Sequence, residues 1–299
     1  MSKLTLLDGG MGRELKRIGA PFSQPLWSAQ ALIESPQHVR LAHQGFIDSG
    51  ADIITVNSYA CVPFHLGESL YQTDGARLAS LAAQIAAEVA QQSERPILVA
   101  GSMPPAMGSY RPDLFQAEVA RAISLTLYQA QDPYVDVWLA ETIASLEELS
   151  MIQSVFASST KPCYYALTLK DDTNIAQLRS GQSVSEAAEQ ICSAGGAGIF
   201  FNCSIPEVMA DAIQQAKSVL EGRAQKIEIG VYANSFTPIK SDHAANETVQ
   251  AMREFSAEDY LAFAKQWYAL GATVIGGCCG ITPRHIQALY EWRRSFEKS

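Results

Sequence analysis

Long hydrophobic runs are missing from this sequence, and so are linker-like and low-complexity stretches. No apolar run reaches the ~20 residues that a membrane-spanning helix needs, which argues against a membrane protein. Charged residues are modest in number, at 18% beside 47% hydrophobic residues, which is the balance of an ordinary globular protein. The length of 299 residues allows one large α/β domain or two small ones.

Positive charge is also in deficit. Lys and Arg number 22 against 31 Asp and Glu, so the net charge of -9 argues against a nucleic-acid partner and mildly favours a cationic or neutral ligand. The segment Met1–Asp8 is too short for a signal peptide. Six cysteines without such a signal indicate a reducing compartment rather than a disulfide framework. We therefore expect a cytoplasmic protein, and we leave open whether it forms a homo-oligomer.

Short runs rich in Val and Ile recur along the chain with little polar alternation. This pattern is typical of strands that are buried on both faces of a parallel sheet. The runs expected as strands are Leu4–Asp8, Asp52–Asn57, Ile97–Gly101, Val135–Ala140, Cys163–Leu169, Gly198–Asn202, Ile227–Tyr232 and Thr273–Gly277.

Helix start signals lie between these runs. Ser35-Pro36 predicts a helix that Gly50 ends, and Asp74 is expected to open a long helix. Capping boxes are expected at Ser145, Ser183 and Ser204, and further helix starts at Ser256 and Thr282-Pro283.

Eight strands that alternate with eight helices predict a (β/α)8 TIM barrel formed by residues 1–299 as one domain. A doubly wound open sheet would use the same elements, but its usual G-x-G-x-x-G fingerprint is absent, since Gly9–Gly12 has a different spacing. The long segments Tyr59–Thr73, Ser102–Asp113 and Asn234–Ser256 are expected as loops at the catalytic face of the barrel.

The adjacent residues Cys278 and Cys279 are the most specific chemical signal in the chain. Adjacent cysteines rarely bridge to each other, but two thiolates on one tight loop can hold a soft metal ion, usually zinc. The alternative is a pair of small buried residues after a strand. Cys203, at the end of the sixth expected strand, supplies a third ligand if the barrel closes. Three thiolates with an open fourth position describe a catalytic Zn2+ site.

The other cysteines, Cys61, Cys163 and Cys192, lack such partners; the last two are interpreted as core residues, and Cys61 is left undetermined. A soft ligand set suits a substrate thiol as the fourth ligand, and zinc would deprotonate that thiol at neutral pH. The thiolate would then attack an electrophilic carbon, such as a methyl group on a positively charged donor. Because clustered thiols oxidise in air, a metal-free form with Cys203 bonded to Cys278 or Cys279 is also expected.

Five segments together resemble the homocysteine S-methyltransferases, a family that includes betaine–homocysteine methyltransferase and the homocysteine domain of cobalamin-dependent methionine synthase. The resemblance runs from Leu7 to His285, and the Asn-Cys-Ser and Gly-Gly-Cys-Cys-Gly segments are its most specific parts. The segments are Asp8–Gly12, Asn57–Tyr59, Glu141-Thr142, Asn202–Ser204 and Gly276–Pro283.

This resemblance implies a zinc-dependent TIM barrel that transfers a methyl group to the thiol of homocysteine in methionine biosynthesis. Cys203, Cys278 and Cys279 match the zinc ligands. Residues that match the substrate-binding positions are Asp8, Gly9, Gly10 and Met11 for the amino-acid end of homocysteine, Glu141 for its ammonium group, Tyr59 near the metal, and Asn234 for the fourth zinc position without substrate. By their residue type alone, these positions also fit a strand-to-loop turn, a solvated acid, a rim aromatic and a turn residue.

Three departures from the family pattern border the donor side of the expected pocket. Arg13 stands where Thr is common, and the segments after Gly101 and after Ser235 diverge. The donor is expected to be a sulfonium, S-methylmethionine or S-adenosylmethionine, with Tyr59 and Tyr110 facing its charge. The alternatives are another thiol or selenol acceptor such as selenocysteine, a betaine-type donor, and a non-catalytic zinc- or thiol-binding barrel. We assign no catalytic role to any histidine: His43 fits a helix face, His65 and His243 loops, and His285 a first helical turn.

Overall fold

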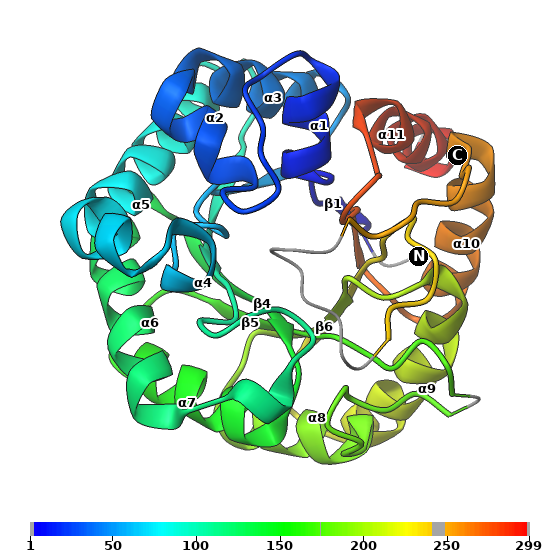
Figure 1. Cartoon of the computed structure of the whole chain (residues 1–299). Helices are drawn as coiled ribbons and strands as arrows, with labels where there is room; N and C mark the ends of the chain where they lie inside the picture. Colours follow the sequence, from blue (N-terminus) through cyan, green and yellow to red (C-terminus); the bar gives the residue numbers. More distant parts are fainter. Residues whose placement is uncertain (1–2, 174, 241–248, 298–299) are drawn as a thin grey trace.

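A computed structural model describes residues 3–173, 175–240 and 249–297. Its parallel strands form a ring that is surrounded by helices (Figure 1). Neighbouring strands pair in the order β1-β8-β7-β6-β5-β4-β3-β2. The strands are β1 Thr5–Leu6, β2 Ile53–Thr55, β3 Leu98–Met103, β4 Val137–Ile143, β5 Cys163–Leu167, β6 Gly198–Asn202, β7 Glu228–Tyr232 and β8 Val274–Ile275.

The two ends of this strand order meet between β1 and β2. Leu7 and Ile53 form a parallel bridge there, and the Asp8 N–H donates to the Ile53 carbonyl at 3.0 Å. The predicted (β/α)8 barrel is therefore confirmed. All of the expected strands are present, and β6 has the expected bounds. β4 runs past its expected end to Ile143, with a register shift after Ala140, so Glu141 lies on the strand itself.

The described helices exceed the predicted one per strand, because α1, α2 and α4 are additional. The α-helices are α1 Met11–Arg17, α2 Ser28–Glu34, α3 Pro36–Asp48, α4 Pro63–Leu66, α5 Glu68–Gln91, α6 Ala117–Gln131, α7 Leu146–Phe156, α8 Val184–Ser193, α9 Met209–Leu220, α10 Ala257–Leu270 and α11 Pro283–Glu297. Short 3₁₀ turns occupy η1 Pro112–Leu114, η2 Asp132–Tyr134 and η3 Pro206–Val208.

Several predicted helix starts are confirmed. Ser35 precedes α3, which begins at Pro36. Ser183 and Ser256 form reciprocal capping boxes with Glu186 and Asp259. α11 begins at Pro283, as the Thr282-Pro283 signal predicts.

Two other predicted starts are wrong, and a third, at Ser145, is confirmed with an incomplete capping box. Asp74 lies inside α5, which already begins at Glu68. Ser204 caps no helix, because its hydroxyl accepts instead from the Leu169 N–H at 2.8 Å. At Ser145 only half of the box forms: the serine accepts from the Glu148 N–H, while the Glu148 carboxylate accepts from the Ala144 N–H. A distant contact therefore overrides the local capping signal at Ser204, while a competing local contact of Glu148 leaves the box at Ser145 incomplete.

Two apolar layers hold the barrel together. The larger layer lies between the strands and the helices, and it includes the fully buried Trp138, Trp267 and Phe46. The smaller layer fills the inside of the ring; its buried members are Leu7, Ile53, Ala100, Val137, Leu139, Ala166, Phe200, Tyr232 and Val274. Because these side chains fill the centre of the barrel, the described residues leave no room for a ligand there. In the part of the chain that is described, no helix is long and apolar enough to cross a bilayer.

Candidate active site

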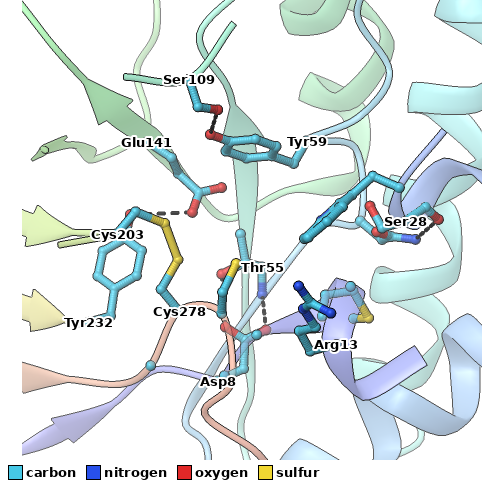
Figure 2. Close-up of a pocket in the computed structure, with 18 of the residues that line it drawn as sticks. Asp8, Arg13, Ser28, Thr55, Tyr59, Ser109, Glu141, Cys203, Tyr232 and Cys278 are labelled. Atoms are coloured by element: carbon cyan, nitrogen blue, oxygen red, sulfur yellow. Dashed lines mark hydrogen bonds between the residues drawn. A yellow bond between two sulfur atoms is a disulfide. The ribbon is translucent and has the colours of Figure 1, made fainter. Parts of the chain in front are cut away.

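A pocket opens at the carboxyl ends of the strands, where the sequence predicts the catalytic face. Figure 2 shows that residues far apart in the sequence converge there. Its lining includes the expected Asp8, Gly9, Gly10, Met11, Tyr59, Glu141, Cys203, Cys278 and Cys279. Asn234 is not among the lining residues. Its side chain is buried, and its Oδ1 accepts from the Phe236 N–H at 3.1 Å.

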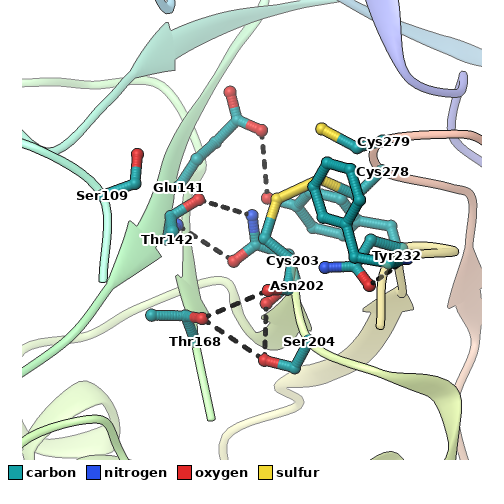
Figure 3. Close-up of a disulfide and its surroundings, with 12 residues drawn as sticks. Ser109, Glu141, Thr142, Thr168, Asn202, Cys203, Ser204, Tyr232, Cys278 and Cys279 are labelled. Carbon is teal, nitrogen blue, oxygen red and sulfur yellow. Dashed lines mark hydrogen bonds between the residues drawn. A yellow bond between two sulfur atoms is a disulfide. The ribbon is translucent and has the colours of Figure 1, made fainter. Parts of the chain in front are cut away.

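The three predicted cysteines lie together at one side of this pocket. Cys203 follows β6, and Cys278 and Cys279 follow β8. Cys203 and Cys278 are joined by a disulfide with a Cα–Cα distance of 5.6 Å, while Cys279 remains a free thiol beside them (Figure 3). One small apolar cluster contains all three cysteines together with Tyr110, Phe236 and Ile239. The structure thus contains one of the two disulfide pairings that the sequence predicts for the oxidised protein.

Among the described residues, no three His, Cys, Asp or Glu side chains are arranged to hold a metal ion. The disulfide explains this for the cysteines, because a bonded sulfur is no longer a thiolate ligand. Reduction by two electrons would release two thiols next to the Cys279 thiol. The donor set of three sulfurs therefore fits zinc in the reduced protein. Burial raises the pKa of the Cys279 thiol to about 11, and the nearby Arg13 guanidinium opposes that rise.

The Asn-Cys-Ser segment fixes the backbone on both sides of the cluster. Cys203 has a φ of 48° and Thr142 a φ of 59°, both in the region that side-chain-bearing residues rarely adopt. The Asn202 side chain spans the two, since its Oδ1 accepts from the Thr142 N–H at 2.9 Å and its Nδ2 donates to Thr142 Oγ1 at 3.0 Å. Asn202 therefore links the Cys203 turn to the strand end that carries Glu141.

Two carboxyl groups, Asp8 and Glu141, enter the pocket from β1 and β4. The Asp8 carboxylate accepts from the Thr55 N–H at 2.7 Å and from the Thr55 hydroxyl at 3.0 Å. Glu141 accepts from the Ser102 hydroxyl at 2.6 Å and from the Tyr232 hydroxyl at 3.3 Å. Burial raises the pKa of Asp8 to about 8 and that of Glu141 to about 7. Neither has a described basic partner in a salt bridge, so the pair suits a cationic group of a ligand.

Gly10 lets the loop after β1 pass directly over the cysteine loop. A Cβ at Gly10 would lie 2.4 Å from the Cys278 carbonyl oxygen. The Gly10 N–H donates to the Ile281 carbonyl at 2.9 Å. This glycine therefore serves first to bring the two loops together, and its N–H is already engaged before any substrate carboxylate arrives.

Aromatic and polar side chains complete the pocket. The hydroxyl of Tyr59 lies 2.7 Å from Ser109 Oγ, and burial raises the pKa of this tyrosine. His65 belongs to α4 rather than to a loop; it borders the pocket, and its Nδ1 lies 3.0 Å from the Pro25 carbonyl. His43 is buried in α3 away from the pocket, His285 lies in the first turn of α11, and His243 falls outside the described residues.

Sequence reasoning assigned no site role to several lining residues, namely Trp27, Thr55, Ser109, Tyr232 and Phe236. Tyr232 could have been found, because it ends an expected strand, whereas Thr55 lies inside the expected strand Asp52–Asn57 and ends only the observed β2. Trp27, Ser109 and Phe236 come from loops, where no periodic pattern marks which side chains turn inward. Cys61 proves to be a buried core residue, like Cys192, and Cys163 is partly buried.

A model of the homocysteine S-methyltransferase family matches residues 5–292. The chain belongs to the homocysteine S-methyltransferase family. It is 29% identical to a selenocysteine methyltransferase of Astragalus bisulcatus, with 97% of this chain and 92% of that protein covered. A crystal structure of the homocysteine methyltransferase MmuM from Escherichia coli, in its metallated form, matches with a TM-score of 0.79 and 26% identity. The oxidised form of MmuM matches with the same TM-score and 25% identity, and both matches cover 97% of this chain and 96% of MmuM.

Membership of the homocysteine S-methyltransferase family makes this protein a methyltransferase enzyme. Methyl transfer to homocysteine is the activity common to the family match and to MmuM. The pocket described above brings cysteine sulfurs and the carboxyl groups of Asp8 and Glu141 to one space. Figure 2 shows the Cys203–Cys278 disulfide and Glu141 on the same side of that space.

Proposed function

We propose that this protein catalyses zinc-dependent methyl transfer from a sulfonium donor to the thiol of homocysteine, giving methionine. The observation that carries the proposal is the grouping of three cysteine sulfurs in one pocket with two carboxyl groups, of which Asp8 is buried and Glu141 is partly buried. Sulfur ligands suit a thiol substrate, and buried carboxylates suit the ammonium group at the other end of the same small molecule. The whole chain is proposed to act as one homocysteine-binding barrel domain.

Cys203, Cys278 and Cys279 would hold the zinc ion once the disulfide is reduced. Bound zinc would lower the pKa of a substrate thiol, so that the thiol is deprotonated to a nucleophilic thiolate at neutral pH. The apolar cluster of Tyr110, Phe236 and Ile239 packs around the cysteines and excludes water from the sulfur nucleophile. With this arrangement no side chain needs to act as a general base.

Asp8 and Glu141 are proposed to bind the homocysteine ammonium group. Each keeps its place through fixed donors, Thr55 for Asp8 and Ser102 for Glu141. An arriving ammonium group would bring positive charge between two carboxyl groups whose burial disfavours their ionisation, so binding would lower both pKa values. Holding this end fixes where the homocysteine sulfur lies, and rate then depends on aligning that sulfur with the donor methyl group.

The donor is proposed to be S-methylmethionine or S-adenosylmethionine. Tyr59 and Tyr110 line the pocket, and aromatic faces attract a sulfonium through cation–π contact. A betaine-type donor carries a similar positive charge and stays an alternative. A second acceptor, selenocysteine, is favoured by one observation: the selenocysteine methyltransferase of Astragalus bisulcatus is similar to this chain over nearly its full length.

The proposal is tested with a panel of donors and acceptors. Reduced protein is incubated with zinc, one acceptor (homocysteine or selenocysteine) and one donor (S-methylmethionine, S-adenosylmethionine or betaine). We expect methionine to form from homocysteine and a sulfonium, and the activity to disappear with a chelator. A reduced protein that binds zinc but transfers no methyl group from any donor would instead support the non-catalytic alternative.

A further inference from the structure

Arg13 brings a positive charge into a pocket whose other described charges are the acidic Asp8 and Glu141. It lies in α1 and lines the pocket together with the cysteines. In Figure 2 it extends into this space from the side opposite Glu141.

Two aromatic rings hold the guanidinium in place. Its central carbon, Cζ, lies 5.3 Å from the centroid of the Trp27 ring and 5.8 Å from that of the Phe236 ring. Trp27 in turn packs on Gly12, where a Cβ would lie 2.5 Å from the indole Nε1. A long side chain that is stacked in this way is pre-organised, so less rotamer entropy is lost when it binds a ligand.

The guanidinium has no anionic partner among the described residues. It forms none of the salt bridges found there, and its buried Nε has no hydrogen-bond partner. A planar guanidinium with free N–H groups matches a carboxylate, which it can bind through two parallel hydrogen bonds. The nearby Gly10 N–H cannot replace it in that role, because it donates to the Ile281 carbonyl.

We propose that Arg13 binds the carboxylate of an amino-acid substrate in this pocket and so selects substrates that carry one. The inference rests on the proposed methyl transfer, which involves two molecules of this kind. Homocysteine and S-methylmethionine each have an ammonium and a carboxylate group. Glu141 and Arg13 lie on opposite sides of the pocket, so its charges complement a molecule that carries both an ammonium and a carboxylate group.

A binding experiment tests the carboxylate requirement without relying on catalysis. Isothermal titration of the reduced, zinc-loaded protein compares L-methionine with L-methioninol, in which a CH2OH group replaces the carboxylate. The variants are Arg13→Met, which keeps an unbranched side chain between the two rings, and Arg13→Lys, which keeps the charge but loses the planar fork. Lys16→Met, an exposed change on the same helix, is the matched control.

The natural protein and the Lys16 variant are expected to prefer methionine over methioninol by roughly 10-fold or more, as charge-assisted hydrogen bonds allow. Arg13→Met should lose that preference, and Arg13→Lys should keep only part of it. Equal affinity for the two ligands in the natural protein, or an undiminished preference in a folded Arg13→Met variant, overturns the proposal. Thermal unfolding of each variant confirms that it is folded.

Steady-state kinetics then identify which substrate brings the carboxylate. If the donor does, Arg13→Met raises the KM of S-methylmethionine by roughly 10-fold and leaves that of its carboxamide unchanged. If homocysteine does, the KM of homocysteine rises in the same way and that of 3-aminopropane-1-thiol does not. If Arg13→Met raises the KM of neither S-methylmethionine nor homocysteine, the assignment is contradicted. The isothermal titration needs no turnover. It therefore tests carboxylate binding by Arg13 even if the protein does not catalyse the proposed methyl transfer.

Discussion

At the scale of single residues, the protonation of Asp8 and Glu141 determines how strongly the pocket binds a cationic group. Both carboxyl groups are held by hydrogen bonds, and burial raises the pKa of each into the neutral range. Below that range they are protonated and neutral, and above it they are anionic. An ammonium group is bound best by the anionic forms, so the proposed acceptor site should become stronger as pH rises from 6 to 8.

The first prediction concerns Glu141. Glu141→Gln should raise the KM of homocysteine roughly 10-fold, since it removes a charge-assisted contact, and it should weaken the dependence of that KM on pH between 6 and 8. Zinc content should not change. Kinetics at fixed donor concentration provide the measurement. Glu148→Gln is the control, because Glu148 also has a pKa raised to about 7 by burial but lies outside the pocket lining. An unchanged homocysteine KM would remove Glu141 from the site.

The second prediction concerns Cys279, the thiol that stays free beside the disulfide. Cys279→Ser replaces a soft sulfur ligand by a hard oxygen, so the reduced variant should hold much less zinc than the natural protein and lose activity. Metal analysis after dialysis measures this. Cys163→Ala, which changes a partly buried thiol at the other end of the barrel strands, should retain zinc. Full zinc and full activity in the Cys279 variant would refute the three-sulfur site.

At the scale of elements, a buried ion pair connects several loops at the catalytic face. Arg179 and Asp171 lie 2.9 Å apart in the segment between β5 and α8, with side chains 4% and 0% exposed. Asp171 also accepts from the N–H groups of Ile205, after β6, and Ile239, after β7. Arg179 stacks over the Tyr110 ring at 5.1 Å, so the pair supports a residue that lines the pocket.

The third prediction follows from this pair. Arg179→Met should cost about 3–5 kcal/mol of unfolding free energy, because it leaves the Asp171 charge buried without its partner. Urea unfolding measures the loss. The exposed pair of Arg77 and Asp74 gives the contrast, since Arg77→Met should change stability little. An Arg179 variant as stable as the natural protein would show that the tie does not hold these loops.

Elements could be predicted where the sequence carries a local cause. The β-branched runs gave all eight strands, and Ser183 and Ser256 gave helix starts because their capping partners lie three residues on. Helices α1, α2 and α4 were missed, since none begins with a side-chain cap and each is seven residues or shorter. The helix start predicted at Ser204 was wrong because its hydroxyl oxygen accepts a hydrogen bond from the Leu169 N–H, 35 residues away.

Closure of the barrel explains the site at the scale of the whole molecule. Cys203 and Cys278 are 75 residues apart, and only the ring of strands brings them together. Residue types at expected strand ends therefore sufficed to predict the three cysteines as one group, whereas the binding roles of Asp8 and Glu141 were implied by the resemblance to the homocysteine S-methyltransferases. The orientation of Arg13 between Trp27 and Phe236 was beyond such reasoning, because it depends on packing between loops that no sequence period describes.

The redox state of the cysteines also acts on the molecule as a whole. With Cys203 and Cys278 joined, two of the three proposed ligands are unavailable to a metal ion. Activity should therefore require both reductant and zinc, and neither alone should suffice.

The central claim is tested most directly by measuring methionine formed from homocysteine and S-methylmethionine. The fourth prediction is that protein reduced and loaded with zinc forms methionine catalytically, whereas the same sample forms none after chelation or while the Cys203–Cys278 disulfide is intact. Methionine formation at an equal rate by the oxidised, zinc-free protein would contradict the account.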